Sequence, residues 1–142
     1  KEALYSAVIH RVVGALRDAI APSMVMDGSF EERLLSLVDA FVDFLEERVY
    51  FAPLIVREIV DGHGPGRDLV LDGLVPIVDL LERWIGEDGG DQIIQGLPVR
   101  SAVMQVASDA VLRASSGPLR DPLWGAASQS RELTRCLFFG RS

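Results

Sequence analysis

Residues 1–20 read KEALYSAVIHRVVGALRDAI, and this stretch decides the fold class because its apolar residues recur at helical spacing. The recurring positions are Leu4, Tyr5, Val8, Ile9, Val12, Val13, Leu16 and Ile20. A stripe of this width is typical of an amphipathic helix. A helix start commonly shows a Ser, Thr, Asp or Asn cap, and none stands before Lys1. We therefore expect a longer parent chain whose upstream residues begin this helix.

The rest of the chain predicts further helices, because no stretch alternates between apolar and polar residues as a strand does. Ser29 and Glu32 form an S-x-x-E capping box, a clear helix start. Pro22 is expected to end the first helix near Ala21, and Pro76 to kink or break a later one. The expected helices span residues 1–21, 30–48, 52–62, 67–85, 98–116 and 121–140. The sequence thus predicts an all-α fold, with residues 1–142 forming a single domain as a helical bundle of about six main helices.

Composition excludes several partners. The 142 residues carry 14 basic and 21 acidic side chains, a net charge of −7, so this chain alone should bind neither nucleic acid nor an anionic membrane surface. Hydrophobic residues make up 49% of the chain, with mean hydropathy +0.24, more than one compact monomer needs, which indicates a partner surface. Cys136 is the only cysteine, which favours a reducing, cytoplasmic location. No apolar run approaches the roughly 18 residues that span a bilayer.

Catalytic and metal-binding patterns are missing from the sequence. The two histidines, His10 and His63, lie on different elements, and Cys136 has no histidine near it in sequence. The glycine clusters lack the strand–loop–helix context of a phosphate-binding loop. We therefore expect no metal, no cofactor and no enzymatic activity.

A small-molecule pocket between helices is the better prediction. Such pockets are lined by apolar side chains with a few polar groups. Glu58 shares a helical face with Ile55 and Ile59, and a carboxylate there requires a partner, either a ligand or an arginine on a neighbouring helix. Aromatic residues in such positions are more often ordinary core residues than ligand contacts. The candidate ligand-binding residues are Phe41, Phe44, Phe51, Ile55, Glu58, Ile59, Leu81, Trp84 and Met104.

The last two expected helices favour self-association. Small residues on the helix over 98–116 allow close backbone approach, and larger apolar residues follow on the last helix. A chain of this length cannot easily cover both helices on all sides, so one face is expected to meet a second copy as a homodimer. The candidate interface residues are Ala102, Val106, Ala110, Leu123, Trp124, Ala127, Leu133, Leu137 and Phe138.

The pattern of Lys1, Glu2, Leu4 and Tyr5, followed by an apolar periodic run, resembles the start of the linking helix in TetR-family transcriptional regulators. The order and proportions of the later helices are also similar to that family's regulatory domain. The resemblance implies a TetR C-terminal-domain-like fold whose last two helices form a four-helix bundle with those of a second copy. It also implies a helix-turn-helix DNA-binding domain before Lys1, which is absent from this sequence.

The function that the resemblance implies is ligand-responsive transcription regulation, most simply repression. A largely apolar effector would enter among the first four helices and shift the first, so that the paired DNA-binding domains no longer match their half-sites. DNA would be a partner only through the missing domain. Two alternatives remain: a stand-alone helical small-molecule-binding protein unconnected to DNA, and a small cofactor-free enzyme that uses a carboxylate such as Glu58.

Overall fold

The computed structural model describes residues 2–64 and 66–141, and within these ranges it contains helices and no strand. The all-α prediction is therefore confirmed for the described residues. The longer helices are α1 (Glu2–Val25), α2 (Phe30–Glu47), α3 (Phe51–Asp61), α4 (Arg67–Trp84) and α5 (Val99–Ala114). The shorter elements used below are η1 (Ile85–Gly89), η3 (Gly117–Leu119), α6 (Arg120–Trp124), α7 (Ser130–Thr134) and η4 (Arg135–Phe139).

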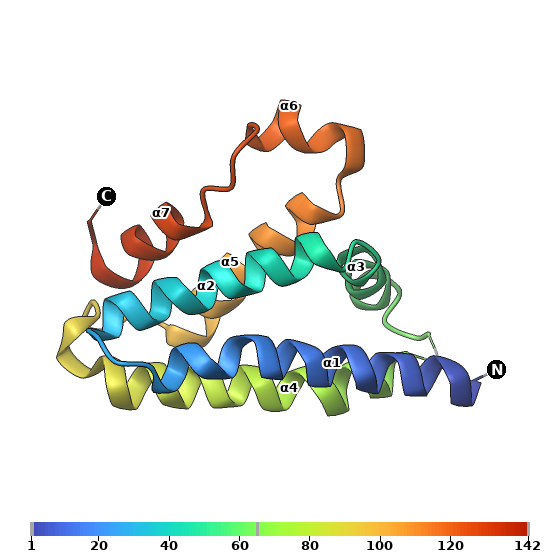
Figure 1. Ribbon diagram of the computed structural model, residues 1–142, viewed down its shortest axis with the longest axis horizontal. Coiled ribbons are helices and arrows are strands. Elements are labelled where there is room, and N and C mark those ends of the chain that lie inside the picture. The colour runs from blue at the N-terminus through green and yellow to red at the C-terminus, as the bar shows by residue number, and fades with distance from the viewer. Residues whose placement is uncertain (1, 65, 142) are drawn as a thin grey trace.

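The long helices form two layers. Figure 1 shows α1 and α4 side by side and running in the same direction, while α2 and α5 return in the opposite direction. Helix α3 lies at the end where α2 finishes, and it packs against α4 and α5. Helix α7 returns along the first half of α2, whereas α6 lies at the edge of the molecule, where it contacts α5. The core lies between the two layers, and its largest fully buried apolar side chains are Phe30, Phe44, Phe138 and Ile85.

Helix α1 buries five of the eight apolar positions that the sequence predicts for its stripe, whereas Leu4 and Val8 are exposed and Tyr5 is partly buried. Its buried positions are Ile9, Val12, Val13, Leu16 and Ile20. The expected end near Ala21 is wrong, because the helix continues through Pro22 to Val25. Pro22 is exposed near the end of the helix, where its missing N–H removes one backbone hydrogen bond. The extra turn also buries Ser23, whose Oγ lies 2.9 Å from Oγ of Ser36 on α2. The start expected before Lys1 lies outside the described residues.

Local signals set the ends of the next two helices. The capping box before α2 is confirmed, since the Glu32 amide donates to Ser29 Oγ over 3.1 Å. Helix α3 ends at Gly62, which adopts a left-handed conformation with φ +67°. Both ends follow from residues within one helical turn of the boundary.

A kink or a break is expected between Gly73 and Ile77; helix α4 is continuous, so a break is wrong, and a kink stays a prediction. Pro76 is exposed, which lets solvent satisfy the carbonyl that a proline leaves without a donor. Gly73 is buried against α1, where an added Cβ would lie 3.1 Å from both methyl carbons of Val13. This glycine therefore allows α1 and α4 to pack closely rather than interrupting α4.

The single last helix expected over residues 121–140 is also wrong. The chain forms α6, leaves the helical path at Gly125, and begins α7 only at Ser130. Gly125 adopts φ +87°, a conformation that L side chains rarely adopt and that ends α6. Trp124 Nε1 donates to Asp109 Oδ1 over 3.0 Å, which holds α6 against α5. The second long helix expected for a dimer bundle is therefore two short segments.

Candidate functional site

An apolar pocket of about 640 Å³ lies in the described part of the chain and is bounded mainly by α3, α4 and α5. Its inner wall reaches α1 at Leu16 and Ile20, and Phe138 contributes near the C-terminus. Among the lining side chains only Arg100, Ser108 and Thr134 carry polar groups. We call this hollow the apolar pocket. Its volume lies in the range of about 300–1,000 Å³ typical of small-molecule sites.

Six of the nine ligand-binding candidates line the apolar pocket. They are Phe41, Phe51, Ile55, Ile59, Leu81 and Met104. They come from α2, α3, α4 and α5, so the fold brings together side chains that lie far apart in sequence. The arrangement supplies a continuous apolar lining for a ligand.

The remaining aromatic candidates, Phe44 and Trp84, belong to the core. The Phe44 ring meets the Phe51 ring edge-on, with centroids 5.4 Å apart. Trp84 packs on Phe30 at 5.0 Å, and its Nε1 donates to Asp88 Oδ2 over 3.1 Å. Neither side chain lines the apolar pocket. The sequence predicts both as candidates because helical periodicity shows that an aromatic side chain faces inward. It does not show whether the side chain borders a cavity or packs on another ring.

The last candidate, Glu58, has a protein partner that the sequence did not indicate. Its side chain is 6% exposed, and its Oε1 accepts a 2.5 Å hydrogen bond from the Tyr5 hydroxyl of α1. Burial, and then this hydrogen bond, raise the pKa of Tyr5 above its usual value. Neither an arginine nor a ligand is therefore needed as the partner of Oε1. The bond ties the beginning of α1 to α3, whose other face lines the apolar pocket.

The loop before α4 packs directly on this carboxylate. A Cβ added at Gly66 would lie 2.5 Å from Glu58 Oε1 and 2.8 Å from the Tyr5 hydroxyl. A Cβ added at Gly64 would lie 3.1 Å from Glu58 Oε2, an oxygen with no hydrogen-bond partner among the described residues. The two glycines thus let the backbone close over a buried acidic group, which we call the Glu58 junction.

The apolar pocket reaches the surface along α3, α4 and α5. Five of its apolar lining side chains are exposed: Ile59, Val60, Val75, Met104 and Leu112. At its rim, Arg100 Nη1 donates to Asp79 Oδ1 over 2.7 Å and to Glu82 Oε1 over 2.9 Å. These bonds raise the pKa of Arg100, which stays charged and links α5 to α4. The opening is therefore bordered by exposed apolar side chains and, on one side, by the paired charge of Arg100.

The dimer-interface candidates separate into two groups. Ala102, Val106, Ala110 and Phe138 lie in the core of the chain, with 2–7% exposure, where a second copy does not reach them. Leu123 and Ala127 are exposed in the α6 region, whereas three candidates are partly buried: Trp124, Leu133 and Leu137. The first group was misassigned because small residues on a helix allow close packing within a chain as well as between chains.

Sequence reasoning missed several lining residues of the apolar pocket. On α4 these include Val70, Leu74 and Val78, and on α5 Val103, Ala107 and Val111. Both sets recur every four residues, so each forms one face of its helix. That periodicity was visible in the sequence, but it does not tell which face borders a hollow.

Comparisons with protein families, curated proteins and solved structures find no match to this chain. Among the described residues no group of three or more His, Cys, Asp or Glu is placed to hold a metal ion. In the same residues no helix is both long and apolar enough to cross a bilayer. The chemistry on which a function can be argued is therefore that of the chain's own pockets.

Proposed function

We propose that this chain binds a small, largely apolar effector in the apolar pocket, as the regulatory domain of a TetR-like transcriptional regulator. The observation that carries the proposal is the pocket itself: about 640 Å³, lined mainly by helices α1 to α5 and almost free of polar side chains. A binding role needs no catalytic group, so the proposed domain is not an enzyme.

The lining restricts the chemistry of the effector. The Thr134 hydroxyl already donates to the Ser130 carbonyl over 2.7 Å, and Arg100 is paired with Asp79 and Glu82. Ser108, which is exposed, is the remaining polar contributor. An effector with an extended hydrocarbon or aromatic body and few polar groups fits this lining, because its transfer from water is favourable and leaves few buried polar atoms unpaired.

The Glu58 junction supplies a route from the pocket to α1. Ile55, about one turn before Glu58 in α3, and Ile59, the residue after it, both line the pocket, and Glu58 accepts a hydrogen bond from Tyr5. An effector that displaces α3 would change the Tyr5–Glu58 bond and therefore the position of the first turns of α1. For this to regulate anything, the effector must bind one arrangement of α1 more tightly than the other.

The proposal includes a homodimer, which places two such domains in one regulator. Apolar side chains exposed where α5 leads into α6 support this part: Leu112, Leu119 and Leu123. Exposed leucines of this kind are typical of a surface that meets a partner. Light scattering after size exclusion should report twice the mass of one chain, and Leu123→Glu should reduce it to a monomer. A wild-type monomer at all concentrations would contradict the dimer.

Binding of Nile red, a neutral apolar dye, tests the pocket directly. We expect saturable binding to the wild type. The dissociation constant should rise at least about tenfold in Met104→Glu, because the substitution puts a charge at the exposed edge of the apolar pocket. Met26→Glu is the matched control, since it changes a methionine that is similarly exposed but lies outside the pocket. Native mass spectrometry of the purified wild-type chain would detect a retained ligand. Equal affinity in the wild type and Met104→Glu would contradict the proposed site.

The link to DNA requires the parent chain. In a protein that carries a helix-turn-helix before Lys1, an apolar effector should change the affinity for operator DNA in a gel-shift titration. Tyr5→Phe should weaken that response while leaving Nile red binding unchanged, because it breaks the Glu58 junction and not the pocket. Codons upstream of Lys1 that encode no DNA-binding domain would favour the alternative, a small-molecule-binding protein unconnected to DNA.

A further inference from the structure

Arg113 on α5 is a buried cation whose charge is poorly compensated. Its side chain is 7% exposed, and its Nη2 donates to the Ala126 carbonyl over 3.2 Å. Its nearest carboxylate oxygen is Oε1 of Glu46, 3.9 Å from Nη1, which is too far for a hydrogen bond. Its Nε has no hydrogen-bond partner among the described residues. A buried guanidinium normally has a close anionic partner, because its desolvation is otherwise unfavourable.

Arg113 also lines a second cavity, of about 300 Å³, which we call the arginine pocket. The pocket lies between α2, α5 and the segment that leads from η3 into α7. Its polar lining residues are Glu46, Arg113, Arg120, Ser128 and Ser130. Its apolar lining residues are Val42, Leu45, Val49, Ala110 and Ala114. None of these residues lines the apolar pocket, so the two cavities are distinct.

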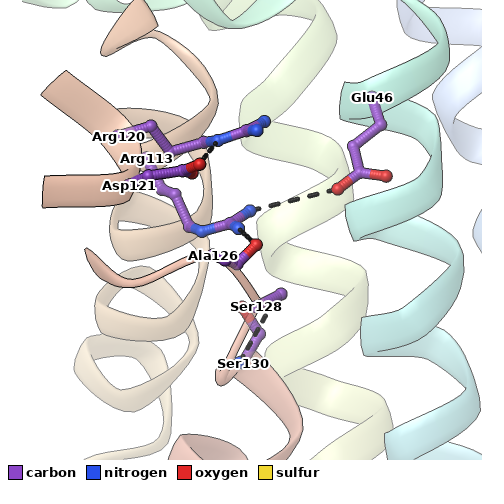
Figure 2. A network of polar contacts seen from close by, with 7 residues as sticks. All are labelled: Glu46, Arg113, Arg120, Asp121, Ala126, Ser128 and Ser130. Carbon is purple, nitrogen blue, oxygen red and sulfur yellow. Dashed lines mark hydrogen bonds and ion pairs between the residues drawn. The ribbon is translucent and has the colours of Figure 1, made fainter. Parts of the chain in front are cut away.

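The polar groups converge from two sides of the arginine pocket. Figure 2 shows the guanidinium groups of Arg113 and Arg120 extending toward α2 and Glu46, with Ser128 and Ser130 below them. Arg120 Nε donates to Asp121 Oδ1 over 3.1 Å, and its two terminal nitrogens have no hydrogen bond among the described residues. Ser128 Oγ donates to Ser130 Oγ over 3.2 Å. Two guanidinium groups and the Ser130 hydroxyl are donors suited to an oxyanion.

We propose that the arginine pocket binds a small organic molecule through a carboxylate or phosphate group, which takes the place of Glu46 beside Arg113. Glu46 can move away from Arg113 when the ligand binds, because its side chain is 54% exposed and can turn toward solvent. The apolar wall from α2 and α5 contacts the rest of the molecule, and the volume limits it to a single small ring or a short chain. This site is independent of the proposed effector pocket.

Three probes separate the sources of the oxyanion: benzoate, phenyl phosphate and inorganic phosphate. Nuclear magnetic resonance of the wild-type chain should show saturable shifts of the Arg113 Nε–H and Ser130 amide signals with benzoate, phenyl phosphate or both. Sodium chloride at matched ionic strength should not reproduce them. A response to inorganic phosphate alone would overturn the organic ligand, and no saturable response to any probe would overturn the site.

Variants test which side chains hold the anion. Arg113→Gln should abolish binding, and Arg131→Gln is the matched control, since Arg131 is exposed and paired with Asp39. Glu46→Gln should tighten binding about tenfold, because it removes a competing charge about 4 Å from the guanidinium. If Arg113→Gln does not fold, Arg120→Gln should still weaken binding about tenfold. Unchanged affinity in both Glu46→Gln and Arg120→Gln would overturn the proposed geometry.

Discussion

Two regions of this molecule each bury one charged side chain, but the hydrogen bonds and the packing around the two charges differ. Glu58 on α3 and Arg113 on α5 are both 6% exposed. Glu58 accepts a 2.5 Å hydrogen bond from Tyr5, and the backbone at Gly66 closes over its carboxylate. Arg113 has its nearest carboxylate 3.9 Å away and borders a cavity of about 300 Å³. The chain thus packs tightly around the first charge, although Glu58 Oε2 has no hydrogen-bond partner among the described residues, and it leaves the second charge beside a cavity.

This difference separates a structural connection from a candidate binding site. A buried charge with a short hydrogen bond and no adjoining hollow holds elements together, here α1 and α3. A buried charge beside a hollow has the donors and the space for a partner from outside the chain. In the two proposals, Glu58 transmits a change at the apolar pocket, whereas Arg113 contacts a ligand directly. Substitutions at the two regions should therefore differ in sign as well as in size.

The largest effect is expected at the Glu58 junction, from Gly66→Ala. The new Cβ would lie 2.5 Å from Glu58 Oε1, so the carboxylate must move and lose its bond to Tyr5. We expect the free energy of unfolding, measured with urea, to fall by about 3 kcal/mol. Gly86→Ala is the matched control, because a Cβ there meets nothing within 4 Å. Equal stabilities of the two variants would mean that the junction is not tightly packed.

Removing the Tyr5 hydroxyl should have a smaller effect that depends on pH. Tyr5→Phe leaves Glu58 Oε1 without its donor, and we expect a loss of about 1.5 kcal/mol near neutral pH. The pKa of Tyr5 is raised in the folded chain, mainly by burial and then by the hydrogen bond to Glu58. This contribution is therefore fully present below the unfolded pKa of about 10, and it is lost as the pH rises through the folded value.

Urea unfolding at about pH 8 and about pH 11 checks this sign. The stability difference between the wild type and Tyr5→Phe should shrink at the higher pH, because only the wild type loses the Tyr5 contribution. A difference that stays constant or grows would show that Tyr5 is not held in its neutral form by Glu58.

At the arginine pocket the expected effect on stability has the opposite sign. Arg113→Met keeps much of the side-chain volume and removes a buried charge that has no close carboxylate. Without an added anion we expect the free energy of unfolding to rise by about 1 kcal/mol. Benzoate should stabilise the wild type and leave Arg113→Met unchanged, because only a ligand that binds the folded state shifts the equilibrium. A loss of more than about 2 kcal/mol would instead identify Glu46 and Ala126 as sufficient partners.

The sequence predicted those features of the fold that depend on neighbouring residues in the chain. The stripe of α1, the Ser29–Glu32 cap and the end of α3 at Gly62 are of this kind, because each is set within a few residues. The helix end expected at Pro22 and the break expected at Pro76 failed for another reason. The penalty of a helical proline depends on whether solvent reaches the freed carbonyl, and this is a property of the packed structure.

The candidate site was predictable to a similar extent. Helical periodicity placed six of the proposed ligand residues among those that line the apolar pocket. It could not distinguish them from Phe44 and Trp84, which face other aromatic rings. The sequence did not indicate that Arg113 is buried, because a single arginine on a helix is usually exposed to solvent. It is buried by chain that returns 13 residues later, at Ala126, and such a contact is not encoded near position 113.

The smallest effect is expected from an arginine that has a partner but little burial. Arg131 on α7 pairs with Asp39 of α2, yet both side chains are about half exposed. We expect Arg131→Gln to change the free energy of unfolding by about 0.5 kcal/mol or less, and 1 M salt to remove even that difference. Arg113→Met should keep its larger effect at the same salt concentration, because a buried charge is poorly screened. If Arg131→Gln had the larger effect, pairing rather than burial would decide what an arginine contributes here, and the contrast between Glu58 and Arg113 would lose its basis.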